Sequence, residues 1–144
     1  MPIGRMLLKS ISGSNKMSKL RTDGARLLYT WLIPHLDING CYSGDAEVIK
    51  GNIFTRLKKS TKTIELYLKD IEGFELIFRY EANGDIFLIV PDFDEKQPSL
   101  NPTREAKPTT PLPTLEQIGS LSGPTQDKLK HNINEVKLSK DKPS

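Results

Sequence analysis

Apolar side chains recur every three or four positions in residues 22–33, which is the spacing of one helical face. This segment predicts a helix whose core-facing stripe consists of Ala25, Leu28, Tyr29, Leu32 and Leu36. Thr22 is expected to cap it, because a threonine hydroxyl can accept from a free backbone N–H there. Pro34 should kink or end the helix, since its ring clashes with the preceding turn. Residues 37–40 then predict a turn and residues 41–43 a short strand.

Two more amphipathic helices are expected, over residues 45–54 and from residue 61 to Gly73. The first buries one aliphatic face, made of Ala46, Ile49 and Ile53. At 100° per residue, the second gathers an apolar face within about 60°, and this face holds Ile64, Tyr67, Leu68 and Ile71. The opposite side of the second helix carries two lysines, Lys62 and Lys69. The expected cap is Thr61 or Thr63.

Alternating apolar and polar residues predict a β-hairpin after Gly73. Residues 76–81 and 85–90 are its strands, joined through Ala82-Asn83-Gly84. Asn-Gly is a strong hairpin signal because both residues tolerate a positive φ. A helix, a basic turn, a second helix and a hairpin in this order are typical of a winged helix-turn-helix. The predicted fold class is therefore α+β, with three helices and the hairpin as the wing.

The two ends of the chain differ from this middle part, residues 18–95, which is expected to form the winged-helix domain. Residues 1–17 predict a flexible basic arm, since glycines and serines interrupt any hydrophobic period. Residues 96–144 are rich in proline and poor in aromatic residues, so they cannot bury enough apolar surface to fold by themselves. We expect a proline-rich linker and a mostly disordered tail there. A short helix near 124–138 could form around Leu129, Ile133 and Val136.

The charges are distributed unevenly, although the formal net charge is only +3. Residues 1–22 hold five basic side chains and no acid, whereas residues 23–95 hold eight basic and thirteen acidic ones. Half of the cations in that middle part fall between residues 56 and 62. A mostly acidic body with one basic edge and a basic arm can face an anionic partner while repelling it elsewhere.

Several classes of function have little support in the sequence. No run of about 18 apolar residues predicts a membrane span, and the N-terminus lacks the long apolar region of a secretory signal. A cytoplasmic location is therefore expected. His35 and His131 have no metal-ligand spacing, and the lone Cys41 excludes an internal disulfide. We expect no catalysis, no metal and no cofactor; the acidic cluster after the hairpin is interpreted as a solvated strand end, made of Asp92, Asp94 and Glu95.

The charge pattern favours binding of double-stranded DNA. In a winged helix-turn-helix the third helix lies in the major groove and the preceding turn straddles phosphates. The turn would place three cations on phosphates, namely Arg56, Lys58 and Lys59. The third helix would contribute Lys62, Glu65, Leu66 and Lys69. Glu65 could accept from a cytosine amino group, and Leu66 could touch a thymine methyl group or another subunit.

The hairpin and the arm supply the remaining expected DNA contacts. Arg79 and Asn83 would reach the neighbouring minor groove or the DNA backbone from the hairpin. The basic arm could track phosphates through Lys16, Lys19 and Arg21. Two alternatives remain open: the basic turn could be an ordinary solvated loop, and the arm could serve only solubility.

The sequence also resembles the N-terminal domain of phage replication initiators, the replisome-organiser or DnaD-like proteins. The resemblance covers roughly residues 3–113 and rests on ARLLYTWLIPHLDINGCYSGDAEVIKGNIF, a helix starting with threonine, GFELIFRYEANGDIFLIVPDF and EKQPSLNP. Asp92-Phe93, Gln97 and Pro98 match the step that follows the wing in that group. The resemblance implies a winged helix that binds a replication origin, acting in the host cytoplasm if a phage encodes the chain.

Two departures from the family pattern matter. An aromatic-histidine-glutamine step common after the wing is Glu95-Lys96-Gln97 here, so any role of that histidine does not carry over. Family members often have a larger C-terminal module that engages a replicative helicase or its loader. In this chain only the segment near 124–138 could do so.

Two other functions fit the same sequence. A transcriptional regulator would bind DNA in the same way, so the fold alone does not distinguish a regulator from an initiator. A winged helix could also act only as a protein adaptor in primosome assembly, or form homo-oligomers, and an exposed Leu66 would allow either. The DNA target sequence is not readable from these residues.

Overall fold

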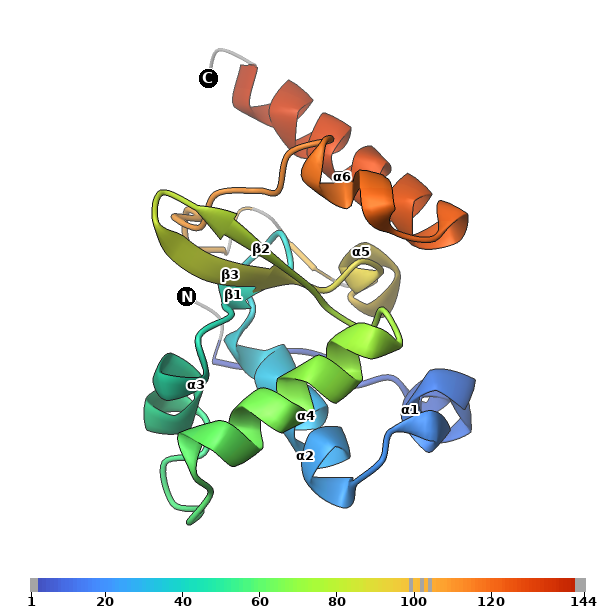
Figure 1. The fold of residues 1–144 in the computed structure, drawn as a ribbon. Coiled ribbons are helices and arrows are strands. Elements are labelled where there is room, and N and C mark those ends of the chain that lie inside the picture. The colour runs from blue at the N-terminus through green and yellow to red at the C-terminus, as the bar shows by residue number, and fades with distance from the viewer. Residues whose placement is uncertain (1–2, 99, 102, 104, 142–144) are drawn as a thin grey trace.

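Three helices and one face of a small sheet enclose the main core. The computed structural model describes residues 3–98, 100–101, 103 and 105–141, with side chains as far as Ile133. Within these residues the chain has an α+β fold (Figure 1). No helix in the described part is both long enough and apolar enough to cross a membrane.

Helix α2 spans Asp23–Leu32, close to the prediction, and the Thr22 hydroxyl accepts from the Ala25 N–H at 3.1 Å as expected. The chain continues through a short 3-10 helix, Ile33–His35, that contains Pro34. All five residues of the predicted stripe are buried, namely Ala25, Leu28, Tyr29, Leu32 and Leu36. The prediction of this helix and of its core-facing side is confirmed.

Helices α3 (Ala46–Asn52) and α4 (Thr61–Gly73) follow, and α4 packs against both α2 and α3. The expected cap of α4 is wrong. Ser60, which is in an extended conformation, accepts from the Thr63 N–H at 3.1 Å. Thr61 is already the first helical residue, so its backbone cannot take the extended conformation that a cap requires.

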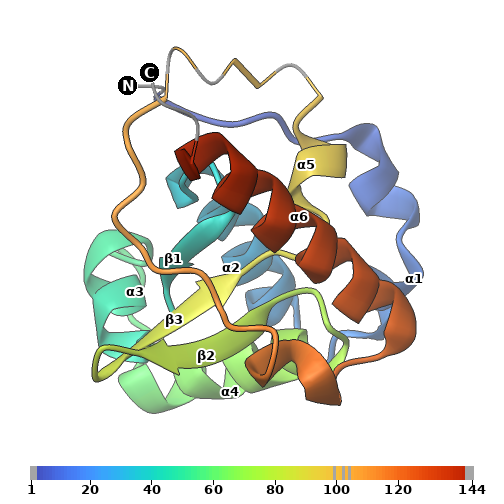
Figure 2. The same ribbon diagram turned by 90° about the horizontal axis from the view of Figure 1, so that it is seen from above.

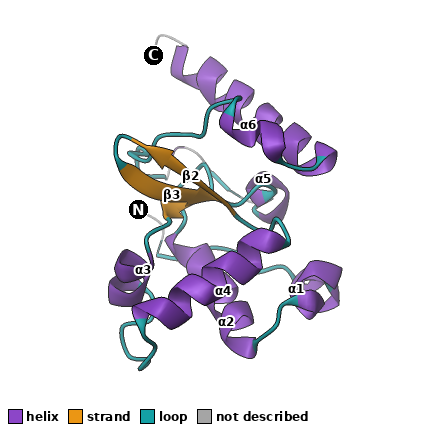
Figure 3. Ribbon diagram, viewed as in Figure 1, coloured by secondary structure: helices purple, strands orange, loops and turns teal. Residues whose placement is uncertain are grey.

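The sheet has three antiparallel strands in the order β1-β3-β2. Figure 3 shows the strands of the hairpin between α4 and α6. They are β1 (Cys41–Ser43), β2 (Phe78–Ala82) and β3 (Asp85–Ile89). Asn83 and Gly84 have φ values of 54° and 83°, so the β2–β3 connection is the tight Asn-Gly turn that the sequence predicts. The hairpin lies between α4 and α6, with its tip on the side where α3 lies (Figure 1).

The described part of residues 1–17 does not form the free arm that its composition predicts. A 3-10 helix, Lys9–Gly13, and α1, Asn15–Lys19, pack on the body, and Met17 and Leu20 are buried. The Arg26 guanidinium fixes the connection to α2, because it donates to the carbonyl groups of Met17, Ser18 and Leu20. Isolated apolar residues without a period gave no local signal for this packing.

Residues after Lys96 also differ from the predicted disordered tail. After α5 (Phe93–Lys96) the chain passes along the outer face of the sheet, forms a 3-10 helix at Gln117–Ser120, and continues into α6 (Gly123–Asp141). Figure 2 shows α6 crossing the sheet on the side opposite α2 and α4. Helix α6 lies where the sequence predicted a short helix near 124–138.

A second apolar cluster explains this packing. It forms between the tail and the outer face of the sheet, and its buried members are Cys41, Tyr80, Ile89, Ile118 and Leu129. The Tyr80 hydroxyl donates to the Pro111 carbonyl at 2.6 Å, which ties the extended segment to β2. The tail therefore folds without a core of its own, because the sheet supplies the apolar side chains against which it packs.

Candidate nucleic-acid interface

The turn between α3 and α4 presents the cations that the sequence singled out. Arg56 and Lys58 are exposed and Lys59 is half-buried. Phe54, only 1% exposed, anchors the start of the turn and packs edge-on against Trp31, with ring centroids 5.7 Å apart. An apolar anchor thus holds a loop whose charged side chains face solvent.

The outward side of α4 continues this cationic surface. Lys62, Leu66 and Lys69 share one side of the helix, since positions four and seven residues apart nearly superpose at 100° per residue. All three side chains are exposed, Leu66 to 59%. Within the described residues, no ion pair engages any cation from Arg56 to Lys69. We call the turn and this side of α4 the cationic face.

Arg21 joins the cationic face at the C-terminal half of α4. Its backbone N–H donates to the Asp70 carboxylate at 2.7 Å, and its Nε lies 3.9 Å from the same group. A depression of about 560 Å³ lies here, and Arg21, Leu66 and Lys69 are among the residues that line it. Tyr67 and Phe74 also line it. Three of the predicted contact residues therefore meet at one concave surface.

Lys16 and Lys19 do not join the basic turn. Both are exposed on α1, and α1 lies on the opposite side of α2 from α3 (Figures 1 and 2). Hydrogen bonds from Ser122 and Thr125 lower the pKa of the Glu75 carboxyl, and the charge of Lys16 makes a smaller contribution in the same direction. The predicted phosphate-tracking arm is thus a separate basic patch on the body.

Two predicted DNA contacts, Arg79 and Glu65, are placed differently from the expectation. Arg79 lies near the start of β2 rather than at the hairpin tip, and its guanidinium donates to both Glu65 oxygens at 2.8 Å. It also pairs with Glu72 at 3.3 Å. Glu65 and Glu72 are seven residues apart on α4, so both lie on the side that faces the hairpin. The single Arg79 charge is shared between the two carboxylates, so in this structure Arg79 and Glu65 are engaged with each other.

This ion-pair cluster positions the hairpin on α4. A bidentate guanidinium–carboxylate pair fixes distance and orientation at once, which a single lysine contact would not do. The Arg79 side chain is 13% exposed, so the pair is shielded better than an ordinary surface pair. Hydrogen bonds from Arg79 lower the pKa of Glu65, and those from Glu65 raise the pKa of Arg79.

We expect Arg79→Met to destabilise the protein by about 1–2 kcal/mol at neutral pH, because it leaves two adjacent carboxylates without their cation. A group whose folded pKa is lowered stabilises the fold above its unfolded pKa, which is about 4.3 for glutamate. The difference between wild type and variant should therefore shrink as the pH falls below about 4. Urea unfolding at several pH values measures it. Arg56→Met is the matched control, and an equal loss in both variants would contradict the positioning role.

Asn83 is where the sequence placed it, exposed at the hairpin tip. Its positive φ shows that it also builds the turn, so any binding role is added to a structural one. Two residues of the interface escaped sequence reasoning. Ser60 sets the start of α4, and its identity as an N-cap residue next to the predicted helix was the available signal. Phe74 helps to line the depression, and no local pattern distinguished it from a core residue.

The cysteine, the histidine and the acidic residues that the sequence analysis considered for other chemistry lie in separate parts of the described structure. Cys41 is buried under the outer sheet face, where burial raises the pKa of its thiol well above the usual range. His35 is exposed and packs against the Tyr42 ring, with centroids 5.9 Å apart. Asp92 pairs with Lys96, and Glu95 with Lys128. Among the described residues no group of three or more metal-ligating side chains is found.

Comparisons with known proteins add no relative. No family model matches the sequence, and neither the curated proteins nor the solved structures gave a match.

Proposed function

We propose that this chain is a winged-helix protein that binds duplex DNA through the cationic face. The observation that carries the proposal is the row of cations running from the turn onto α4, on an otherwise mostly acidic body. All of them except the half-buried Lys59 are exposed, and none forms an ion pair with any residue that the structure describes. When such a row of cations contacts DNA phosphates, it releases the counterions bound there, and this release favours binding. Helix α4 would lie in the major groove, with Lys62 and Lys69 toward the bases and the turn on the DNA backbone.

The hairpin is the wing in this proposal. The structure supports it through the order of α2, α3, α4 and the β2–β3 hairpin, and through the Arg79 cluster that holds the hairpin beside α4. Asn83 would then be the wing residue nearest the DNA backbone, while Arg79 and Glu65 keep wing and helix in register. Both Glu65 oxygens accept from Arg79, so we assign no contact with cytosine to Glu65.

The biological setting that we propose is initiation of DNA replication on a phage-type or other mobile element. Its support is the resemblance of residues 3–113 to replication initiators, which the helix, turn and hairpin positions carry. A helicase or its loader would have to meet α6 on sides other than its apolar one, because Leu129 is fully buried and Ile133 packs against the sheet cluster.

The test is duplex binding measured by fluorescence anisotropy at about 0.15 M salt, followed by footprinting over the chain's own coding region and flanks. A specific site should bind at least 10³-fold more tightly than the non-specific range, which is on the order of 10⁻⁴ to 10⁻⁶ M. Repeated protected sites near an origin would support the initiator, and one site over a promoter would indicate a regulator. Binding that stays in the non-specific range on every fragment would contradict the proposal.

A protein-only adaptor is the second candidate, favoured by one observation. The depression beside α4 is lined by Leu66, Tyr67 and Phe74, and Leu66 is 59% exposed. An apolar anchor from a partner protein could fill such a surface. The anisotropy measurement separates this candidate from DNA binding.

A further inference from the structure

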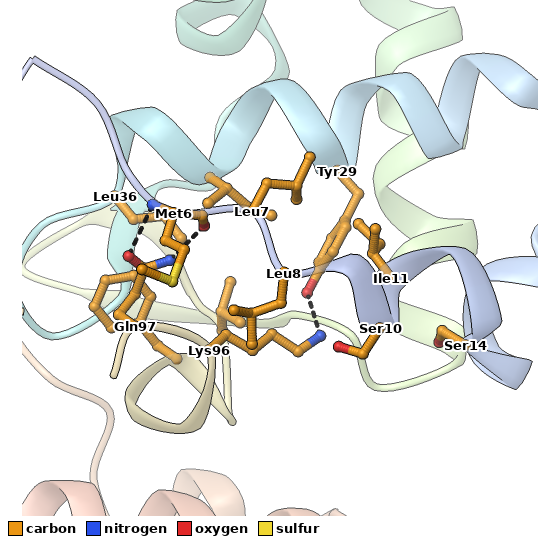
Figure 4. A pocket seen from close by; sticks show the side chains of 13 residues that line it. Met6, Leu7, Leu8, Ser10, Ile11, Ser14, Tyr29, Leu36, Lys96 and Gln97 are labelled. Atoms are coloured by element: carbon orange, nitrogen blue, oxygen red, sulfur yellow. Dashed lines mark hydrogen bonds between the residues drawn. The ribbon is translucent and has the colours of Figure 1, made fainter. Parts of the chain in front are cut away.

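A cavity lies beneath the N-terminal segment, between residues 6–14 and α2 (Figure 4). Its volume is about 200 Å³. The roof comes from residues 6–14, the floor from α2 and the residues after it, and one end from α5. Most of the wall is apolar, including Leu8, Ile11, Ile33, Val90 and Phe93. Met6 and Leu7 at the rim are 39% and 50% exposed, which leaves a route to solvent.

The N-terminal segment that forms the roof is held by hydrogen bonds to other parts of the protein. The Met6 N–H donates to the Gln97 side-chain oxygen at 3.0 Å, and the Gln97 amide donates back to the Met6 carbonyl at 2.7 Å (Figure 4). The Ser14 hydroxyl caps α1 by accepting from the Met17 N–H. The Met6–Gln97 pair therefore ties one end of the roof to the residue after α5, and at the other end the buried Met17 side chain holds α1 on the body.

Polar groups converge at one end of this apolar space. The Lys96 ammonium donates to the Tyr29 hydroxyl at 3.3 Å, and it lies 3.5 Å from the Asp92 carboxylate. Figure 4 shows the Ser10 hydroxyl pointing toward the same ammonium group. An ammonium group has three donors, and the Tyr29 hydroxyl and the Asp92 carboxylate engage two of them.

Tyr29 offers a second donor here. Its side chain is fully buried, and its oxygen accepts from Lys96, so its own O–H remains to be donated. No acceptor for that proton is found among the described residues. Burial raises the pKa of Tyr29, which keeps the hydroxyl protonated at neutral pH. The hydroxyl can therefore donate to a bound group while it still accepts from Lys96.

We propose that this cavity binds a small monocarboxylate with an apolar body, its carboxylate accepting from the Lys96 ammonium and the Tyr29 hydroxyl. The polar end supplies donors and the walls supply apolar contact, which is the usual make-up of a small-molecule site. A cavity of about 150 Å³ is known to hold benzene, so this slightly larger one matches a single ring with a carboxylate. Benzoate is the probe that fits both requirements.

The experiment is a titration of the full chain, labelled with ¹⁵N, with sodium benzoate, read from amide chemical shifts. Saturable shifts should appear at residues 6–14 and around Tyr29 and Lys96, with a Kd on the order of 1 mM as expected for so small a ligand. Two further probes separate the two parts of benzoate. Acetate has the carboxylate but no ring, and benzyl alcohol has the ring but no charge. Each should bind at least about tenfold more weakly.

Two variants test the named atoms. Tyr29→Phe removes one hydroxyl and Lys96→Met removes the ammonium group, and each should weaken benzoate binding about tenfold. The matched controls, Tyr42→Phe and Lys128→Met, should bind as wild type does. Tyr29→Phe keeps the ring, so it remains informative if Lys96→Met fails to fold. Shifts that do not saturate by about 20 mM, or equal affinity in Tyr29→Phe and Tyr42→Phe, would overturn the proposal. DNA binding plays no part in this readout.

Discussion

Replacing Lys58, Lys59 and Lys62 together with alanine is expected to weaken duplex binding severely and to flatten its salt dependence. Each phosphate contact that is lost lowers the log–log slope of affinity against salt by about 0.9, so three contacts would remove up to about 2.7. The three side chains lie within five residues at the turn and the first turn of α4, and none is in an ion pair within the described residues. Their removal should therefore change binding more than stability. Anisotropy titrations at several salt concentrations measure the slope.

The matched control is Lys107, Lys128 and Lys130 replaced by alanine, which changes the net charge equally. These lysines are exposed and belong to the tail, which packs on the side of the sheet opposite α4 (Figure 2). The control should keep the wild-type slope. If both triple variants lose the same slope, the interaction depends on net charge and not on the cationic face.

The second large effect concerns the tail, where Leu129→Ala should destabilise the protein by about 2–4 kcal/mol. Leu129 is fully buried against the outer face of the sheet, and truncating a buried leucine loses apolar contact and leaves a cavity. Leu115→Ala is the control, because Leu115 is 52% exposed and its loss should change stability by less than about 0.5 kcal/mol. Chemical denaturation of both variants gives the comparison. Equal stabilities would mean that the tail does not belong to the folded unit.

The sequence predicted the elements whose stabilising interactions are local. The stripe of α2, the Thr22 cap and the Asn83-Gly84 turn each depend on residues within about one helical turn of one another. Their positions could be read directly, and the structure has them. The cap of α4 was missed by one residue, because serine and threonine are adjacent there and both can cap.

Long-range partners could not be read in the same way. Arg79 looked like a free cation on the hairpin, yet its partners Glu65 and Glu72 are on another element, fourteen and seven residues earlier. Arg5 similarly looked like part of a flexible basic arm. It pairs instead with Glu105 at 2.6 Å, and both side chains are almost fully buried. The number of charged residues in a segment does not show which distant residues they pair with in the folded protein.

The tail shows the same limit for apolar residues. Ile118 and Leu129 are too few to form a core, so composition predicted disorder. Their partners Tyr80 and Ile89 are on the outer face of the sheet, at least 29 residues earlier in the chain. Tyr80 was the available clue, because a large aromatic ring on a strand face is usually covered by another part of the protein.

The most direct test of the cationic face is an amide chemical-shift map of the ¹⁵N-labelled chain with a short duplex at about 0.15 M salt. Our account predicts that the largest changes fall in residues 56–69 and at the Asn83-Gly84 turn, with little change in α5 and α6. Changes concentrated in α6, or spread evenly over the surface, would contradict it.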